Sequence, residues 1–323
     1  MNTVKKTAIC LSVFMFCFCA KQEKSTEYSQ TTSLSMVESM VAEQRAEVSP
    51  AQTRTRSRGE EVMKAFADAY PDRIGSAEFR NGDWAVPVYG QWFYYADGKL
   101  LPEELRSTAA NYDPQPFYSY NTELPEWQSP DDASVARFKD AVNRRHAHPS
   151  RRSYLFFDAL LRAGNKDEAY KRVKSIRLFG WSALVHYSIM EDLALVEERI
   201  NASAENDPEI RRWLASISSL SGWNWRDIAD TGSRSFHAYG TAIDIVMKPQ
   251  SGMETYWLWS AQKGTDWWNV SYKSRLHPPK SVVKAFEDYG FVWGGKWLFF
   301  DTMHFEYRPE IFILNKLPIE KRK

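Results

Sequence analysis

Two short segments hold the residues of this chain whose types and spacing could do chemistry. They run Ser235-Phe-His237-Ala-Tyr-Gly240-Thr-Ala242-Ile-Asp244 and Asp301-Thr-Met-His304-Phe-Glu306. Two histidines and one carboxylate are a ligand set that zinc uses in hydrolytic sites, where three protein ligands leave a fourth position for water. A further carboxylate beside that water can act as a general base.

We therefore expect His237, Asp244 and His304 to bind one zinc ion. Asp301 lies three residues before His304, so its carboxylate can reach the open side of the metal and act as the base. Gly240 lets the chain turn between the first histidine and the aspartate. All three cysteines lie at or before residue 19, so a metal site in the rest of the chain must use His, Asp or Glu.

The first segment is the more specific of the two signals. Asp-x-x-His alone arises by chance in many proteins. The five fixed positions of the Ser-His-Gly-Ala-Asp pattern in the first segment rarely arise together by chance. With each residue type at roughly one in twenty, a chance match anywhere in the chain is on the order of one in ten thousand.

The pattern Ser-x-His-x-x-Gly-x-Ala-x-Asp followed by Asp-x-x-His resembles the motifs of the zinc D-alanyl-D-alanine carboxypeptidases, in particular their VanY-like branch, and of their L-alanyl-D-glutamate endopeptidase relatives. These families share a fold with lysostaphin-type peptidases and the hedgehog signalling domain. The resemblance extends to Gly222-Trp-Asn-Trp-Arg226 before the first segment and to Trp293-Gly294-Gly295 before the second. It covers residues 179–310, which is under half of the chain.

The resemblance implies the zinc-ligand and base roles given above and adds one more catalytic residue. Arg226 matches an arginine that faces the scissile carbonyl in this family, where a guanidinium stabilises the developing oxyanion. Arg234 is the alternative for that role. Many carboxypeptidases of the family have Glu at the base position, whereas some endopeptidase-like members have Asp. This chain has Asp at that position, Asp301.

Three further residues are expected beside the metal ligands. Ser235 would bind substrate or fix its loop, and Trp293, which borders the paired glycines, would contact substrate. Glu306 lies on the same strand face as His304 and would orient a ligand through a hydrogen bond.

The resemblance thus implies a zinc-dependent peptidase that cuts peptidoglycan stem peptides, most simply a D-alanyl-D-alanine carboxypeptidase. We expect the protein to be a monomer. An L-alanyl-D-glutamate-type endopeptidase is the first alternative. A zinc-containing envelope protein that binds without catalysis is the second, because hedgehog-like domains act by recognition; the presence of Asp301 argues against it. In the third alternative, the protein is a structural envelope lipoprotein in which residues 61–175 have the main role and the peptidase domain is secondary.

The composition excludes some other classes. Lys and Arg number 42 against 41 Asp and Glu, a formal net charge of +1, whereas nucleic-acid binders usually have a strong basic excess. Hydrophobic residues make up 43% of the chain, enough for a sizeable core.

The periodicity of apolar residues predicts an α+β fold with helices and a small antiparallel sheet, and an N-terminal extension of mixed helices and strands. The resemblance implies that helices flank this sheet as in hedgehog and D,D-peptidase domains. The expected helices include residues 167–176, 189–200, 208–220 and 279–289. The expected strands include residues 181–186 and 303–307.

The N-terminus reads as a targeting segment. Lys5 and Lys6 precede an apolar run that ends at Cys19, which is typical of a signal peptide over residues 1–19. Cys17 and Cys19 stand where a lipoprotein cysteine would, so an exported protein, periplasmic or held at the envelope by lipid, is expected. Residues 20–60 are expected to be a flexible tether, residues 61–175 a region without a recognised motif, and residues 176–318 the peptidase domain.

Overall fold

A computed structural model of the chain describes residues 57–124, 126–228, 231 and 233–320, all within one compact unit. The expected signal peptide and the first 37 residues of the expected tether, residues 20–56, lie outside the described residues. Residues 57–60 already belong to a helix that covers residues 57–69. Within the described part, no helix combines the length and the apolar character needed to span a bilayer.

The N-terminal part is a helix followed by a four-stranded antiparallel meander, in the order β1-β2-β3-β4. Its strands and short 3-10 helices are β1 (Glu78–Arg80), β2 (Asp83–Val88), β3 (Gln91–Tyr94), η1 (Ala96–Gly98), β4 (Leu101–Pro102) and η2 (Glu103–Asn111). Tyr89 and Gly90 form the tight turn between β2 and β3, with φ of 47° and 89°.

Three helices and a hairpin come next in the chain. They are α2 (Asp132–Ala147), α3 (Leu155–Leu161), α4 (Lys166–Arg172), β5 (Val173–Leu178) and β6 (Trp181–His186). The Asp131 side chain caps α2 by accepting a hydrogen bond from the Ser134 N–H, and the Asn165 side chain caps α4 by accepting one from the Glu168 N–H. The strand expected over residues 181–186 is confirmed.

A second four-stranded antiparallel sheet, of order β7-β8-β10-β9, contains part of each motif segment. Its strands are β7 (Ile217–Ser221), β8 (Ala242–Met247), β9 (Phe291–Trp293) and β10 (His304–Tyr307). The two central strands are therefore those that contain Asp244 and His304. This arrangement confirms the expected α+β class with small antiparallel sheets.

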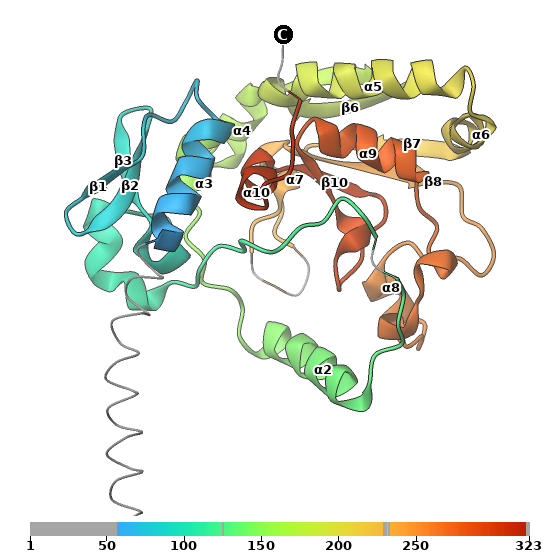
Figure 1. The fold of residues 1–323 in the computed structure, drawn as a ribbon, viewed down its shortest axis with the longest axis horizontal. Helices are drawn as coiled ribbons and strands as arrows, with labels where there is room; N and C mark the ends of the chain where they lie inside the picture. Colours follow the sequence, from blue (N-terminus) through green and yellow to red (C-terminus); the bar gives the residue numbers. More distant parts are fainter. Residues whose placement is uncertain (1–56, 125, 229–230, 232, 321–323) are drawn as a thin grey trace, which may run out of the picture. The chain divides into compact units, whose positions relative to one another are not determined.

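Helices cover one face of this sheet. They are α5 (Met190–Ala204), α6 (Pro208–Ser216) and α9 (Lys280–Asp288), and Figure 1 shows α5 and α9 side by side. Ile243, Ile245 and Phe305 from the sheet join Phe286 from α9 in the core between them. The remaining elements are η3 (Tyr187–Ile189), α7 (Phe236–Tyr239), α8 (Trp257–Gln262), η4 (Trp267–Asn269), η5 (Tyr272–Ser274), η6 (Gly294–Lys296) and α10 (Pro309–Leu314).

Two expected helices end earlier than their sequence pattern indicates. The helix expected over residues 167–176 stops at Arg172, because the chain from Val173 onward pairs with β6. The helix expected over residues 208–220 stops at Ser216, because Ile217 begins β7 and pairs with β8. Cross-strand hydrogen bonds outweigh the local helical periodicity in both places.

The N-terminal region shares a core with the motif-bearing part of the chain. Phe66, Phe156 and Tyr239 are buried in one cluster, and the rings of Phe157 and Phe236 meet edge to face at 5.2 Å. The expected domain boundary between residues 175 and 176 falls inside β5. Helix 57–69 and α3 therefore pack directly behind the first motif segment.

Candidate metal centre

Asp244 and His304 lie opposite each other on neighbouring strands. The antiparallel register of β8 and β10 pairs His304 with Asp244, and Phe305 with Ile243. Because side chains alternate along a strand, Ile243 and Phe305 enter the helix-covered core while Asp244 and His304 share the other face. The Nδ1 atom of His304 lies 2.9 Å from Oδ1 of Asp244.

His237 reaches the same point from α7, the four-residue helix that precedes β8. The buried Ser235 caps this helix, its Oγ accepting a hydrogen bond from the His237 N–H at 3.2 Å. Gly240 ends the helix with a φ of 75°, and a Cβ there would lie 2.8 Å from the backbone nitrogen of His186. A glycine is therefore required for the turn that brings His237 towards Asp244.

The three expected ligands converge on one point. Nε2 of His237 lies 3.1 Å from Oδ1 of Asp244 and 3.2 Å from Nδ1 of His304. A tetrahedral zinc ion with ligand bonds of about 2.0–2.1 Å holds its ligand atoms about 3.3 Å apart. The spacing of these donors therefore fits a zinc ion, and the three residues form a group that could hold a metal.

The remaining nitrogen of each imidazole has its own hydrogen-bond acceptor. Nδ1 of His237 donates to the carbonyl of Gly222 at 2.6 Å, and Nε2 of His304 donates to Oε2 of Glu306 at 3.2 Å. These outer bonds fix the ring orientations and leave the lone pairs of His237 Nε2 and His304 Nδ1 facing Asp244. Metal-binding histidines characteristically have such outer acceptors.

Three lone pairs that face one another repel unless a cation lies between them. Burial lowers the pKa of His304, but its hydrogen bonds to Asp244 and Glu306 outweigh burial and raise that pKa to about 10. Burial raises the pKa of Asp244, but His237 and His304 outweigh it and hold the carboxyl well below its usual pKa. The group thus attracts positive charge strongly, and a divalent cation would take the place of the proton.

Glu306 is held in turn by Arg308, a partner that the sequence did not reveal. Nη1 of Arg308 donates to Oε1 of Glu306 at 3.3 Å, and Nε of Arg308 donates to the Glu310 carboxylate. Burial raises the pKa of Glu306, but the hydrogen bond to His304 and the charge of Arg308 outweigh burial. The pKa of Glu306 is lowered overall, so the carboxylate stays ionised. The alternation of His304 and Glu306 in β10, with Arg308 one residue beyond the strand end, was the available signal.

Asp301 lies in the turn just before β10. Its Oδ1 accepts a hydrogen bond from the Met303 N–H at 3.3 Å, and its backbone pairs with Gly294 and Tyr256. Burial raises the pKa of its carboxyl to about 6, with the charge of Asp244 acting in the same direction. A carboxylate that titrates close to neutral pH is suited to accept and return a proton.

The two arginines considered for the oxyanion differ in their surroundings. Arg226 is exposed, and its Nη1 donates to the backbone carbonyl of Asp227 at 3.5 Å. Arg234 is paired with Asp158 of α3 and lies over the ring of Tyr154 at 4.6 Å. Asp158 and Tyr154 therefore hold Arg234 in place, and Arg226 remains the predicted oxyanion residue with Arg234 as the alternative.

Trp293, which the sequence predicts to contact substrate, is buried in the structure. It is 1% exposed, and its Nε1–H donates to the carbonyl of Thr302 at 2.9 Å. A Cβ on Gly295 would lie 2.1 Å from the Trp293 ring, so the second glycine is needed to let the indole pack against the turn. Trp293 thus supports the segment that contains Asp301.

One family model covers this centre. Residues 229–307 match the model of a family described as D-alanyl-D-alanine carboxypeptidase. The match includes Asp301 and all three converging side chains. Peptidases of this family depend on zinc, in agreement with the His–Asp–His group.

A second family model covers part of the N-terminal region. Residues 62–117 match a family described as a domain of unknown function. The comparisons with curated proteins and with solved structures give no match.

Proposed function

We propose that this protein is a zinc peptidase that hydrolyses a peptide bond in the stem peptides of peptidoglycan. The observation that carries the proposal is the convergence of His237 Nε2, Asp244 Oδ1 and His304 Nδ1 within 2.9–3.2 Å of one another. The match of residues 229–307 to a carboxypeptidase family supports both the reaction and the substrate class.

Zinc bound by these residues would supply Lewis acidity, which polarises a peptide carbonyl and acidifies a water molecule. Asp301 would accept the proton of that water and return it to the leaving amine, which its raised pKa favours. Glu306 and the carbonyl of Gly222 would hold the two imidazoles in the required tautomers. Arg226 would swing its exposed guanidinium towards the oxyanion of the bound substrate.

We infer that the bond cut is the terminal D-alanyl-D-alanine bond, with an internal L-alanyl-D-glutamate-type bond as the second candidate. The description of the matched family favours the first, and the aspartate at position 301 favours the second. We also propose that residues 1–19 direct export and that Cys17 or Cys19 is a lipid attachment point, which would place the enzyme at the envelope. We propose that the enzyme is a monomer there.

The test is digestion of purified muropeptides by the full chain, with zinc or with a chelator, read by mass spectrometry. Loss of a terminal D-Ala that the chelator abolishes would support the carboxypeptidase. A chelator-sensitive internal cut would support the endopeptidase. No product from any stem peptide, with zinc bound, would overturn the proposal and favour a zinc-containing binding protein.

A further inference from the structure

An extended segment of the N-terminal region, residues 117–124, crosses onto the peptidase domain; we call it the strap. The Tyr120 N–H donates to Oδ1 of Asn315 at 3.1 Å, and Nδ2 of Asn315 donates to the carbonyl of Tyr118 at 3.2 Å. The ring of Tyr120 packs against Phe312 of α10 at 5.2 Å. These contacts fix the strap over the end of the chain.

The hydroxyl of Tyr120 makes two buried hydrogen bonds. It donates to Oε1 of Glu287 in α9 at 2.5 Å and accepts the backbone N–H of Trp293 at 2.9 Å. Tyr120 is 7% exposed and Glu287 is 2% exposed. A buried hydroxyl that donates to a carboxylate and accepts from a backbone amide is fully used, so its position is closely defined.

Lys296 closes the same cluster from the other side. Its Nζ pairs with Oε1 of Glu287 and also donates to the carbonyls of Asn121 at 2.9 Å and Thr122 at 2.6 Å. The three donors of this ammonium group are therefore all used, two of them by the strap itself. We call Tyr120, Glu287 and Lys296 the clamp.

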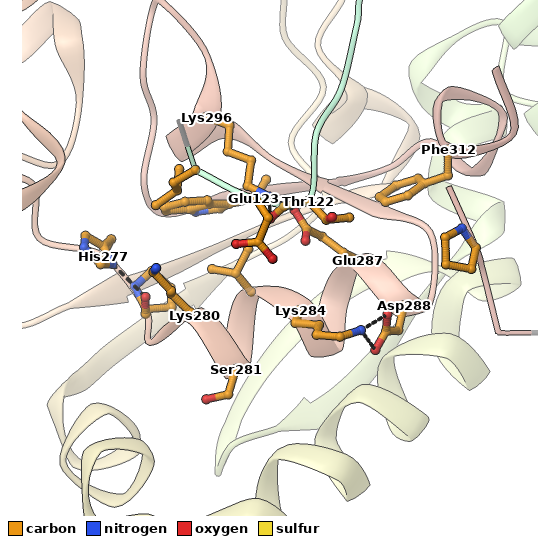
Figure 2. Close-up of a pocket in the computed structure, with 15 residues that line it drawn as sticks. Thr122, Glu123, His277, Lys280, Ser281, Lys284, Glu287, Asp288, Lys296 and Phe312 are labelled. Atoms are coloured by element: carbon orange, nitrogen blue, oxygen red, sulfur yellow. Dashed lines mark hydrogen bonds and ion pairs between the residues drawn. The ribbon is translucent and has the colours of Figure 1, made fainter. Parts of the chain in front are cut away.

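Figure 2 shows two members of the clamp in the wall of a cavity of about 250 Å³, which lies between the strap and α9. Lys296 and Glu287 line it together with Thr122 and Glu123 of the strap. Trp293 also lines this cavity. The strap and the Trp293–Lys296 turn therefore meet at the clamp.

The turn that the clamp holds is also the turn that supports Asp301. The Asp301 N–H donates to the carbonyl of Gly294 at 3.0 Å, and a Cβ on Gly294 would lie 2.7 Å from the Asp301 carbonyl. The indole of Trp293 binds the carbonyl of Thr302, the next residue. The clamp thus fixes both ends of the turn, at Trp293 and at Lys296, and the turn fixes the backbone of Asp301.

We propose that Tyr120 is a positioning residue: through the clamp, the N-terminal region holds the Trp293–Lys296 turn and with it the backbone that places the Asp301 carboxylate. The catalytic consequence rests on the function proposed above. The structural part rests only on the contacts of the strap. This gives the strap a role in the peptidase site that its sequence does not suggest.

The test compares the full-length Tyr120→Phe variant with wild type by hydrogen–deuterium exchange of the amides in residues 291–302 and by kcat and KM on muropeptides. The Trp293 amide loses its acceptor, so its exchange becomes faster. Exchange at Asp301 also becomes faster, because the turn loosens. We expect kcat to fall between about 10- and 100-fold while KM and the zinc content stay close to wild type.

Tyr289→Phe is the matched control. Tyr289 is also a buried tyrosine beside α9, but its hydroxyl accepts from Nη2 of Arg199 at 3.4 Å. This variant should leave both the exchange at Asp301 and kcat unchanged.

A second variant keeps the proposal testable if Tyr120→Phe folds poorly. Lys296→Gln loosens the same turn from its other end, so it should also speed exchange at Asp301 and lower kcat. The double variant should lose little more than the worse single variant, because both changes act through one turn.

The outcomes separate this proposal from the proposed function. Faster exchange at Trp293 alone, with Asp301 still protected and kcat unchanged, would overturn the positioning role. Faster exchange at Asp301 without any change in kcat would also overturn it. If wild type cleaves no muropeptide, the proposed function fails, and the exchange at Asp301 still decides whether the clamp holds the turn.

Discussion

Oε2 of Glu306 lies 3.2 Å from Nε2 of His304, on the side of the imidazole opposite the converging donors. The two residues are separated by one position in β10, so the strand alternation places both on the face that contains the site. The carboxylate therefore fixes the tautomer of His304 and would make its Nδ1 atom a stronger metal ligand.

Replacing Glu306 with Gln should weaken zinc binding between about 10- and 100-fold, as loss of such outer carboxylates typically does. Gln keeps the shape and an acceptor oxygen but removes the charge that polarises His304. Competition titration with a chromogenic chelator measures the effect. Glu320→Gln is the control, because this exposed carboxylate pairs with Arg199; equal affinities for the two variants would contradict the assigned role.

Replacing Gly222 with Ala should disturb the other imidazole. A Cβ at this position would lie 2.1 Å from the carbonyl oxygen of Leu184, so the backbone must shift, and the Gly222 carbonyl that accepts from His237 shifts with it. We expect zinc affinity to fall by about 10-fold or more.

The control for this change is Gly252→Ala, a position with no heavy atom within 4 Å of the added Cβ. Its φ of 76° makes alanine strained, which costs about 1 kcal/mol of stability, but the strain lies away from the ligands. Wild-type zinc affinity in Gly222→Ala would show that the carbonyl does not hold His237.

The sequence was sufficient for several local elements and for the grouping of His237, Asp244 and His304. The strand at residues 181–186 and the strand that begins at His304 follow from local apolar patterns, and the ligand spacing is specific enough to predict a metal group. The strand at Ile217 was missed, because its pairing with β8 depends on residues about 30 positions away.

The parts of the site that were missed are long-range or made by the backbone. The Gly222 carbonyl that binds His237 has no side chain to identify it. Tyr120 and Glu287 are 167 positions apart, and no local pattern predicts that a strap brings them together. The sequence predicts a substrate contact for Trp293 because it borders the paired glycines, and it gives no sign that the indole packs against Gly295, which only the fold shows.

His186 should make the stability of the protein depend on pH. It is 1% exposed, with Nδ1 bonded to Ser188 and Nε2 to the carbonyl of Leu161, and burial lowers its pKa from 6.5 to about 4. The unfolded chain therefore binds more protons between these values. The contribution of His186 to the free energy of unfolding is fully present above about pH 6.5 and is lost as the pH falls through about 4. The free energy of unfolding changes by about 3 kcal/mol across this range.

Urea unfolding at a series of pH values, with chelator present, measures this effect. In His186→Gln the fall in the free energy of unfolding between pH 6.5 and 4 should be smaller than in wild type. His148→Gln, at an exposed position, should follow the wild-type profile. A His186→Gln profile parallel to wild type would show that this histidine does not titrate on unfolding.

In the proposed function, the metal group and Asp301 form one hydrolytic site, in which three residues hold the metal and a fourth moves the proton. Asp301→Ala separates these parts, because the alanine removes the carboxylate and leaves the three ligands in place. The decisive measurement is muropeptide turnover by this variant, taken together with its zinc content. We predict one zinc ion per chain and a loss of turnover on the order of 10²–10⁴-fold, as expected for a general base. Turnover close to wild type, with zinc bound, would contradict the account.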